Sequence, residues 1–150
     1  MSHNAPYKHF AGRRELLAVV AQRDFDQLRS WFESASLEPP ANARASLIGA
    51  LDKLIEYARL HQARYRLLFS DENLSPSQGL VDAAFASFQA FRLLGSRYQL
   101  QVGQIGLDEV ELAGLIYATC HGAIDLQLNG RATGSKGLVI QALGYCPYFQ

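Results

Sequence analysis

The stretch RRELLAVVAQRDFDQLRSWF, residues 13–32, decides the fold class of this chain. Its apolar side chains recur at intervals of three or four residues, which places one set on a single helical face: Leu17, Ala21, Phe25, Leu28 and Phe32. The charged residues lie largely on the other side, and prolines at positions 39 and 40 cannot continue the backbone hydrogen-bond ladder. The stretch therefore predicts an amphipathic helix that ends before these prolines.

The rest of the chain repeats this helical periodicity. We expect helices over residues 47–60, over two turns at 64–69, and from about 76 to the glycines at 103 and 106. Ser75 is the expected N-cap of the last of these, with Gln78 as its reciprocal partner. Asp108 and Glu111 predict a capping box for a helix over 108–128 that is apolar almost all round. Such a helix either runs through the core or packs on a second subunit. No run alternates apolar and polar residues over a strand's length, so we expect an all-α fold.

Composition limits the possible functions. The 150 residues carry 14 basic and 14 acidic side chains, so bulk charge does not attract the chain to nucleic acid or membrane, and any such contact must be local. The charged share of 19% is below the roughly 25% of typical soluble domains, which favours an additional buried surface, as in an oligomer. No apolar run reaches the roughly 18 residues of a membrane span, and the polar first ten residues do not resemble a signal peptide. We expect a cytoplasmic protein that does not contact the membrane.

No motif predicts catalysis. The chain lacks GxSxG, GxGxxG and P-loop patterns, and its four histidines are not spaced for a helical metal site. We therefore expect no metal, no cofactor and no enzymatic activity. Two alternatives remain open. One is a small helical enzyme using His121 and Asp125, which are one helical turn apart, although a buried orienting pair that serves structure is the favoured account of these two residues. The other is a helical adaptor without a ligand.

A row of aromatic residues suggests where a small molecule could bind. Phe85, Phe88 and Phe91 recur every three residues, either as core or as the wall of an apolar pocket facing residues 117–121. The candidate ligand-binding residues are Tyr57, Phe85, Phe88, Gln89, Phe91, Arg92, Tyr117 and His121.

The N-terminus holds a local cationic cluster. Five basic or titratable side chains precede the first acid, Glu15: His3, Lys8, His9, Arg13 and Arg14. A solvated helix end and a phosphate-binding segment both account for this composition.

Two segments resemble one family. Residues 2–17, SHNAPYKHFAGRRELL, resemble the TetR family of bacterial transcriptional regulators, whose recognition helix ends in Tyr-x-His-Phe before a basic residue and Glu-Leu-Leu open the connecting helix. Residues 117–131 are similar to the Trp-His-Gly type of TetR C-terminal domain, and they keep the His-Gly and Gly-Arg pairs but lack the tryptophan. Residues 57–61 and 65–69 also resemble the middle helices of that group.

The resemblance implies a TetR-like helical bundle with an incomplete N-terminal helix-turn-helix, in an N-terminally truncated chain. Residues 1–33 would be the remnant of the DNA-binding domain, and residues 34–150 the ligand-binding and dimerisation domain. The protein would be a homodimeric repressor that releases operator DNA when it binds a small apolar or aromatic effector.

The same resemblance assigns the DNA contacts. Ser2, His3, Asn4 and Ala5 would face base edges, Tyr7, His9 and Arg13 would contact phosphates, and Lys8 would add to this set. Because the two helices that precede the recognition helix in that family are not in the sequence, we expect weak or no specific DNA binding by this chain unless the native protein carries them. The short apolar stretch 138–143 is a poor second dimerisation helix, which leaves the geometry of the expected dimer open.

Overall fold

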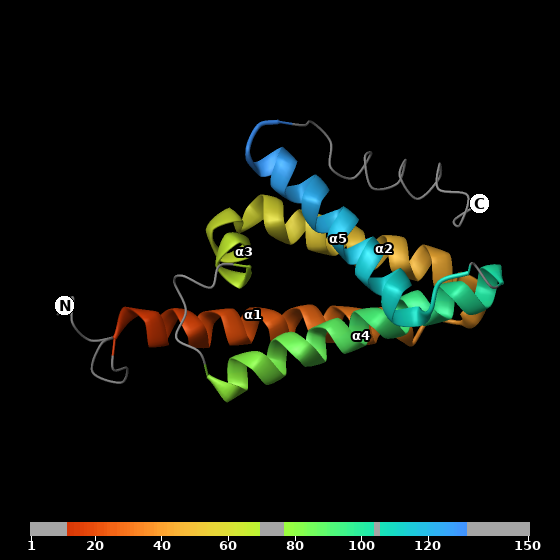
Figure 1. Cartoon of the computed structure of the whole chain (residues 1–150), viewed down its shortest axis with the longest axis horizontal. Helices are drawn as coiled ribbons and strands as arrows, with labels where there is room; N and C mark the ends of the chain where they lie inside the picture. The colour runs from red at the N-terminus through yellow and green to blue at the C-terminus, as the bar shows by residue number, and fades with distance from the viewer. Residues whose placement is uncertain (1–11, 70–76, 104–105, 132–150) are drawn as a thin grey trace.

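The computed structural model describes residues 12–69, 77–103 and 106–131, and within these ranges the chain is helical without strands (Figure 1). The elements are α1 (Arg13–Ser36), the short 3-10 turn η2 (Pro40–Asn42), α2 (Ala43–Leu60), α3 (Gln62–Leu68), α4 (Gln78–Val102) and α5 (Glu109–Leu128). The all-α prediction is confirmed.

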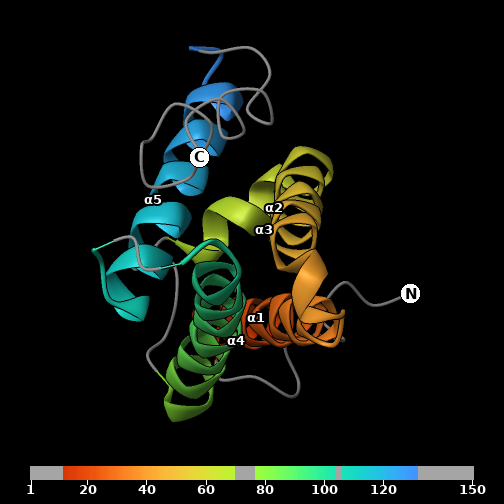
Figure 2. The same ribbon diagram turned by 90° about the vertical axis from the view of Figure 1, so that its right-hand side faces the viewer.

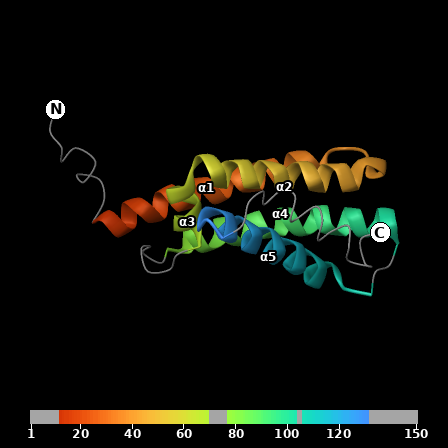
Figure 3. The ribbon, with the colours of Figure 1, turned by 90° about the horizontal axis from the view of Figure 1, so that it is seen from above.

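The helices form a bundle built on α1 and α4. These two long helices run side by side in the same direction (Figures 1 and 3), α2 returns along α1, and α5 folds back from the end of α4. Seen end-on in Figure 2, α2 and α5 lie apart above the α1–α4 pair, and α3 lies near the end of α2. This arrangement leaves α1, α2 and α3 facing one another around one corner of the molecule.

The core fills the space between the long helices. The Phe32 and Phe91 rings meet edge to face, with their centroids 5.2 Å apart, and join α1 to α4. Around them pack fully buried aliphatic side chains from all four long helices: Leu28, Leu47, Leu54, Leu94, Leu112, Ile116 and Ile124. The apolar face predicted for residues 13–32 is the buried face of α1.

The ends of the helices follow local capping chemistry. Asp108 Oδ1 accepts hydrogen bonds from the amides of Val110 and Glu111, each at 2.8 Å, and Glu111 Oε2 accepts from the Asp108 amide at 2.9 Å. The predicted capping box of α5 is confirmed.

The prediction for the start of α4 is wrong by two residues. Ser77 is the N-cap and its hydroxyl accepts from the Leu80 amide at 3.2 Å, while the Gln78 side chain donates to Asp82 instead of closing a box. Ser75 lies outside the described residues. Ser77 stands three residues before Leu80, whose helical amide its hydroxyl reaches.

α1 ends before the prolines, as predicted. Its last residue is Ser36, whose buried hydroxyl donates to the Phe32 carbonyl at 3.0 Å. Residue 33, the end of the first expected domain, lies inside this helix.

α5 exposes apolar side chains on both flanks of its buried face. The helix buries Leu112, Ile116, Cys120 and Ile124 against the bundle, while Leu115 and Leu126 are exposed on one flank and Val110 on the other. The homodimer expected from the apolar character of this segment stays a prediction. None of the described helices combines the length and the hydropathy needed to cross a bilayer.

Replacing Gly95 with alanine is expected to raise the free energy of unfolding by about 0.5–1 kcal/mol, because glycine is a poor helix former. Gly95 is helical and buried, and a Cβ there would lie 3.7 Å from the Ala113 Cβ, an ordinary van der Waals distance. Urea unfolding measures the change. Gly103→Ala is the opposed control: its φ of +90° is a region that L side chains rarely adopt, so this variant should be destabilised. A destabilised Gly95→Ala variant would contradict the α4–α5 packing.

Candidate functional site

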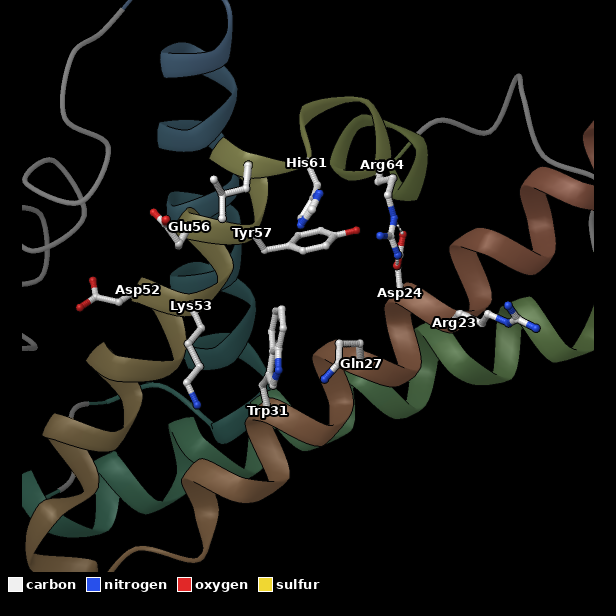
Figure 4. A pocket seen from close by; sticks show the side chains of 11 residues that line it. Arg23, Asp24, Gln27, Trp31, Asp52, Lys53, Glu56, Tyr57, His61 and Arg64 are labelled. Atoms are coloured by element: carbon white, nitrogen blue, oxygen red, sulfur yellow. Dashed lines mark hydrogen bonds and ion pairs between the residues drawn. The ribbon is translucent and has the colours of Figure 1, made fainter.

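A cleft of about 790 Å³ opens where α1, α2 and α3 face one another (Figure 4). This volume lies within the roughly 300–1,000 Å³ of small-molecule sites. Eleven residues line it: Arg23, Asp24, Gln27 and Trp31 from α1, Asp52, Lys53, Glu56, Tyr57 and Leu60 from α2, His61, and Arg64 from α3. On both α1 and α2 the lining positions are adjacent or three to four residues apart, so each helix presents one continuous stripe to the cleft.

The wall of the cleft is aromatic. Trp31, the chain's one tryptophan, meets the Tyr57 ring edge to face at a centroid distance of 5.8 Å, and the His61 ring lies 5.3 Å from Tyr57. Tyr57 is 7% exposed, and its hydroxyl is buried without a hydrogen-bond partner among the described residues. Burial raises the pKa of Tyr57 and the nearby Asp24 carboxylate raises it further, so the phenol is a neutral donor and acceptor at physiological pH.

An ion pair closes one end of the cleft. Asp24 is only 2% exposed, and the Arg64 guanidinium donates to both of its carboxylate oxygens, with Nε at 3.0 Å from Oδ2. The same guanidinium lies 6.0 Å from the centre of the Tyr57 ring. This bidentate ion pair therefore holds α3 against α1, with Arg64 beside the aromatic wall.

The residue after Arg64 ties α3 to α5. The Tyr65 hydroxyl and His121 Nδ1 form a hydrogen bond of 2.7 Å. The Phe69 ring contacts the His121 ring in a tilted orientation, with the two ring centroids 4.2 Å apart. Adjacent residues of α3 thus contact different helices, Arg64 on α1 and Tyr65 on α5. A shift of α3 would therefore disturb its contacts with both α1 and α5.

The structure separates the predicted ligand-binding residues. Tyr57 lines the cleft. The Phe88 and Phe91 rings instead pack against the Tyr117 ring, at centroid distances of 5.9 and 5.1 Å. The other members lie apart: Phe85 is 63% exposed, Gln89 is half-buried, Arg92 pairs with Glu109 at 3.1 Å, and His121 bonds Tyr65. A step of three residues turns about 300° around a helix, so Phe85 and Phe91 are about 120° apart and face different surroundings.

The structure gives no hydrogen bond between His121 and Asp125, the pair on which the enzyme alternative rests. His121 Nδ1 is engaged by Tyr65, and Asp125 Oδ1 accepts from the Asn129 side chain at 3.0 Å. Burial raises the pKa of the neighbouring Cys120 to about 12, which keeps its thiol protonated and a poor nucleophile. Within the described ranges, no three His, Cys, Asp or Glu side chains come together as metal ligands.

Arg13 is the one predicted DNA-binding residue within the described ranges. It is exposed at the first position of α1. The others, Ser2, His3, Asn4, Ala5, Tyr7, Lys8 and His9, lie outside the described residues, as does the stretch 138–143.

Sequence reasoning missed most of the cleft, although one signal for it is visible. The prediction that the charged residues of 13–32 lie largely on the polar side does not hold for Asp24, which is 2% exposed at the edge of the apolar face, and a buried acid requires a partner. That partner, Arg64, is forty residues away in sequence, and no local pattern connects the two.

The free energy of unfolding is expected to fall as the pH drops below about 6.5, partly through His121. Burial lowers the pKa of His121 below its ordinary 6.5, and Asp125 opposes this only in part. Below pH 6.5 the unfolded chain therefore binds a proton that the folded chain resists, which favours unfolding. Urea unfolding from about pH 8 to about pH 5 should show a shallower fall in His121→Gln than in the natural chain. Equal slopes would contradict the neutral, half-buried state of His121.

Comparisons with known proteins establish a shared fold without a function. No family model matches the chain. A solved structure described as a protein of unknown function from Rhodococcus sp. RHA1 is similar over 95% of this chain and 75% of its own, with a TM-score of 0.74 and 27% identity. The genome polyproteins of Kyasanur forest disease virus and Alkhumra hemorrhagic fever virus are each 28% identical over 99 residues, which is 63% of this chain. The chain spans about 3% of the length of these curated relatives.

Proposed function

We propose that this chain is the small-molecule-sensing bundle of a TetR-like transcriptional regulator acting as a repressor. The observation that carries the proposal is the position of the cleft on α1. Asp24, Gln27 and Trp31 line the cleft, and they belong to the helix that begins at Arg13, directly after the segment that resembles a recognition helix. One continuous helix therefore joins the candidate effector site to the candidate DNA-reading segment.

The coupling follows from the stiffness of that helix. Ten residues separate Arg13 from Arg23, about 15 Å at the helical rise. A ligand that pushes on α1 from the α2–α3 side would move the N-terminal end of α1 as a lever. In a dimer that reads two half-sites about 34 Å apart, a change in the spacing of the two segments weakens binding to the operator.

Dimerisation is the second requirement of the proposal. α5 exposes Val110, Leu115 and Leu126, and exposed apolar side chains on one helix are suited to a subunit contact. We propose a homodimer through the surface of α5 that carries Leu115 and Leu126, which lie on the same side of the helix. The effector is a small apolar or aromatic molecule, since the cleft offers the Trp31 and Tyr57 rings.

Two measurements on the whole protein test the proposal. Tagging the gene at its chromosomal locus and sequencing the DNA that precipitates with the cross-linked protein should enrich a few discrete promoter sites. A thermal-shift screen of apolar and aromatic compounds should raise the apparent melting temperature for at least one class, and that compound should reduce the enrichment. No enrichment above an untagged strain would contradict the regulator. A screen without a stabilising compound would contradict the sensor.

A further inference from the structure

We propose that the cleft between α1, α2 and α3 selects an aromatic monoanion, a flat ring system that carries one carboxylate. This inference rests on the proposed sensing function and names the chemical class of its effector. Three features of the cleft carry it: an aromatic wall, an unpartnered buried hydroxyl, and cations without acidic partners.

The wall and the hydroxyl specify a ring with a polar substituent. The Trp31 ring is half-buried and edge-on to Tyr57, so one of its faces is available for stacking against an aromatic ligand. The Tyr57 hydroxyl is buried without a hydrogen bond of normal geometry to a described residue, and it points toward the Arg64–Asp24 pair, which influences its pKa (Figure 4). A polar substituent on the ligand's ring would accept from this phenol.

The charged residues of the cleft indicate the charge of its ligand. Three acids and three bases line the cleft, but the acids are committed elsewhere or point away. Asp24 is bound by Arg64 and Glu56 by Arg59, outside the cleft, at 2.7 Å, and in Figure 4 the Asp52 and Glu56 carboxylates point away from Trp31.

The bases behave differently. Arg23 and Lys53 form no ion pair with a described residue, and in Figure 4 the Lys53 side chain extends into the gap between α2 and α1 beside Trp31. The cleft therefore presents an excess of positive charge next to an aromatic wall, and such a cleft concentrates anions.

Calorimetric titration of the whole protein with three matched naphthalenes tests the inference. 2-Naphthoate, 2-naphthamide and 2-naphthylmethylammonium share one ring system and differ in charge. We expect 2-naphthoate to bind about tenfold more tightly than the amide, and the ammonium to bind most weakly. The advantage of the naphthoate over the amide should shrink as salt is added.

Three variants locate the interaction. Lys53→Gln should weaken 2-naphthoate binding about fivefold and leave 2-naphthamide unchanged. Arg44→Gln removes the same charge at the exposed opposite end of α2 and should change neither. Tyr57→Phe keeps the wall but removes the hydroxyl, so it should weaken the naphthoate and the amide together.

The outcomes separate the inference from the function it rests on. If 2-naphthoate and 2-naphthamide bind equally tightly and Lys53→Gln has no effect, the preference for an anionic ligand is overturned, and the cleft remains a candidate effector site. Tighter binding of the ammonium would overturn that preference in favour of a cationic ligand. If none of the three binds, the aromatic class itself is overturned, and the thermal-shift screen decides the sensing function independently.

Discussion

Replacing Phe91 with alanine should lower the free energy of unfolding by about 3–5 kcal/mol, the cost of emptying a fully buried aromatic site. Phe91 is 0% exposed and its ring contacts both Phe32 of α1 and Tyr117 of α5. The cavity would lie where three helices meet, so the surrounding side chains cannot all relax into it. Such a loss is a large fraction of the roughly 5–15 kcal/mol of a typical domain. Urea or thermal unfolding measures it.

Phe85→Ala is the matched control on the same helix. The Phe85 side chain is 63% exposed, so its removal should change the free energy of unfolding by less than about 0.5 kcal/mol. Similar losses of unfolding free energy in Phe91→Ala and Phe85→Ala would contradict the orientation of α4, because they would mean that both rings are buried.

Arg64→Ala should cost about 3 kcal/mol, the lower end for breaking a buried ion pair, because the arginine itself is half exposed. The loss arises from Asp24, which would remain a charged group inside the bundle without a partner. Asp24→Asn should cost less, since the Arg64 side chain that it leaves behind can turn to water. The expected order of stability is natural chain, Asp24→Asn, then Arg64→Ala.

Arg59→Ala provides the control for a lost arginine. Its pair with Glu56 is more than half exposed on both sides, so no measurable change in stability is expected. An Arg64→Ala variant as stable as Arg59→Ala would show that Asp24 is not buried as described. The unfolding midpoint in urea, compared at one pH for all four proteins, gives the order.

The sequence predicts the helices well because their signals are local. The apolar spacing of residues 13–32 and the Asp108–Glu111 box act within one or two turns, and both are found where expected. The end of α1 at Ser36, before the prolines, is equally local. The N-cap of α4 is Ser77 and not the predicted Ser75. The two serines are chemically equivalent candidates two residues apart, so the local pattern could not choose between them.

The cleft could not be predicted in the same way. Its lining comes from three helices, and the partnership that closes it joins residues 24 and 64. The aromatic row of α4 drew attention because it is regular, but regularity marks a packed face as readily as a binding wall. The buried acid at Asp24, at the edge of an apolar face, was the more informative anomaly.

The indole N–H resonance of Trp31 offers the most direct test of the cleft as the effector site, since the chain has a single tryptophan and hence a single such signal. Titrating isotope-labelled protein with 2-naphthoate should shift this resonance saturably, with the same midpoint as calorimetry. Binding that leaves the indole signal in place while resonances of α4 and α5 move would contradict the account, because the ligand would then occupy a different part of the bundle.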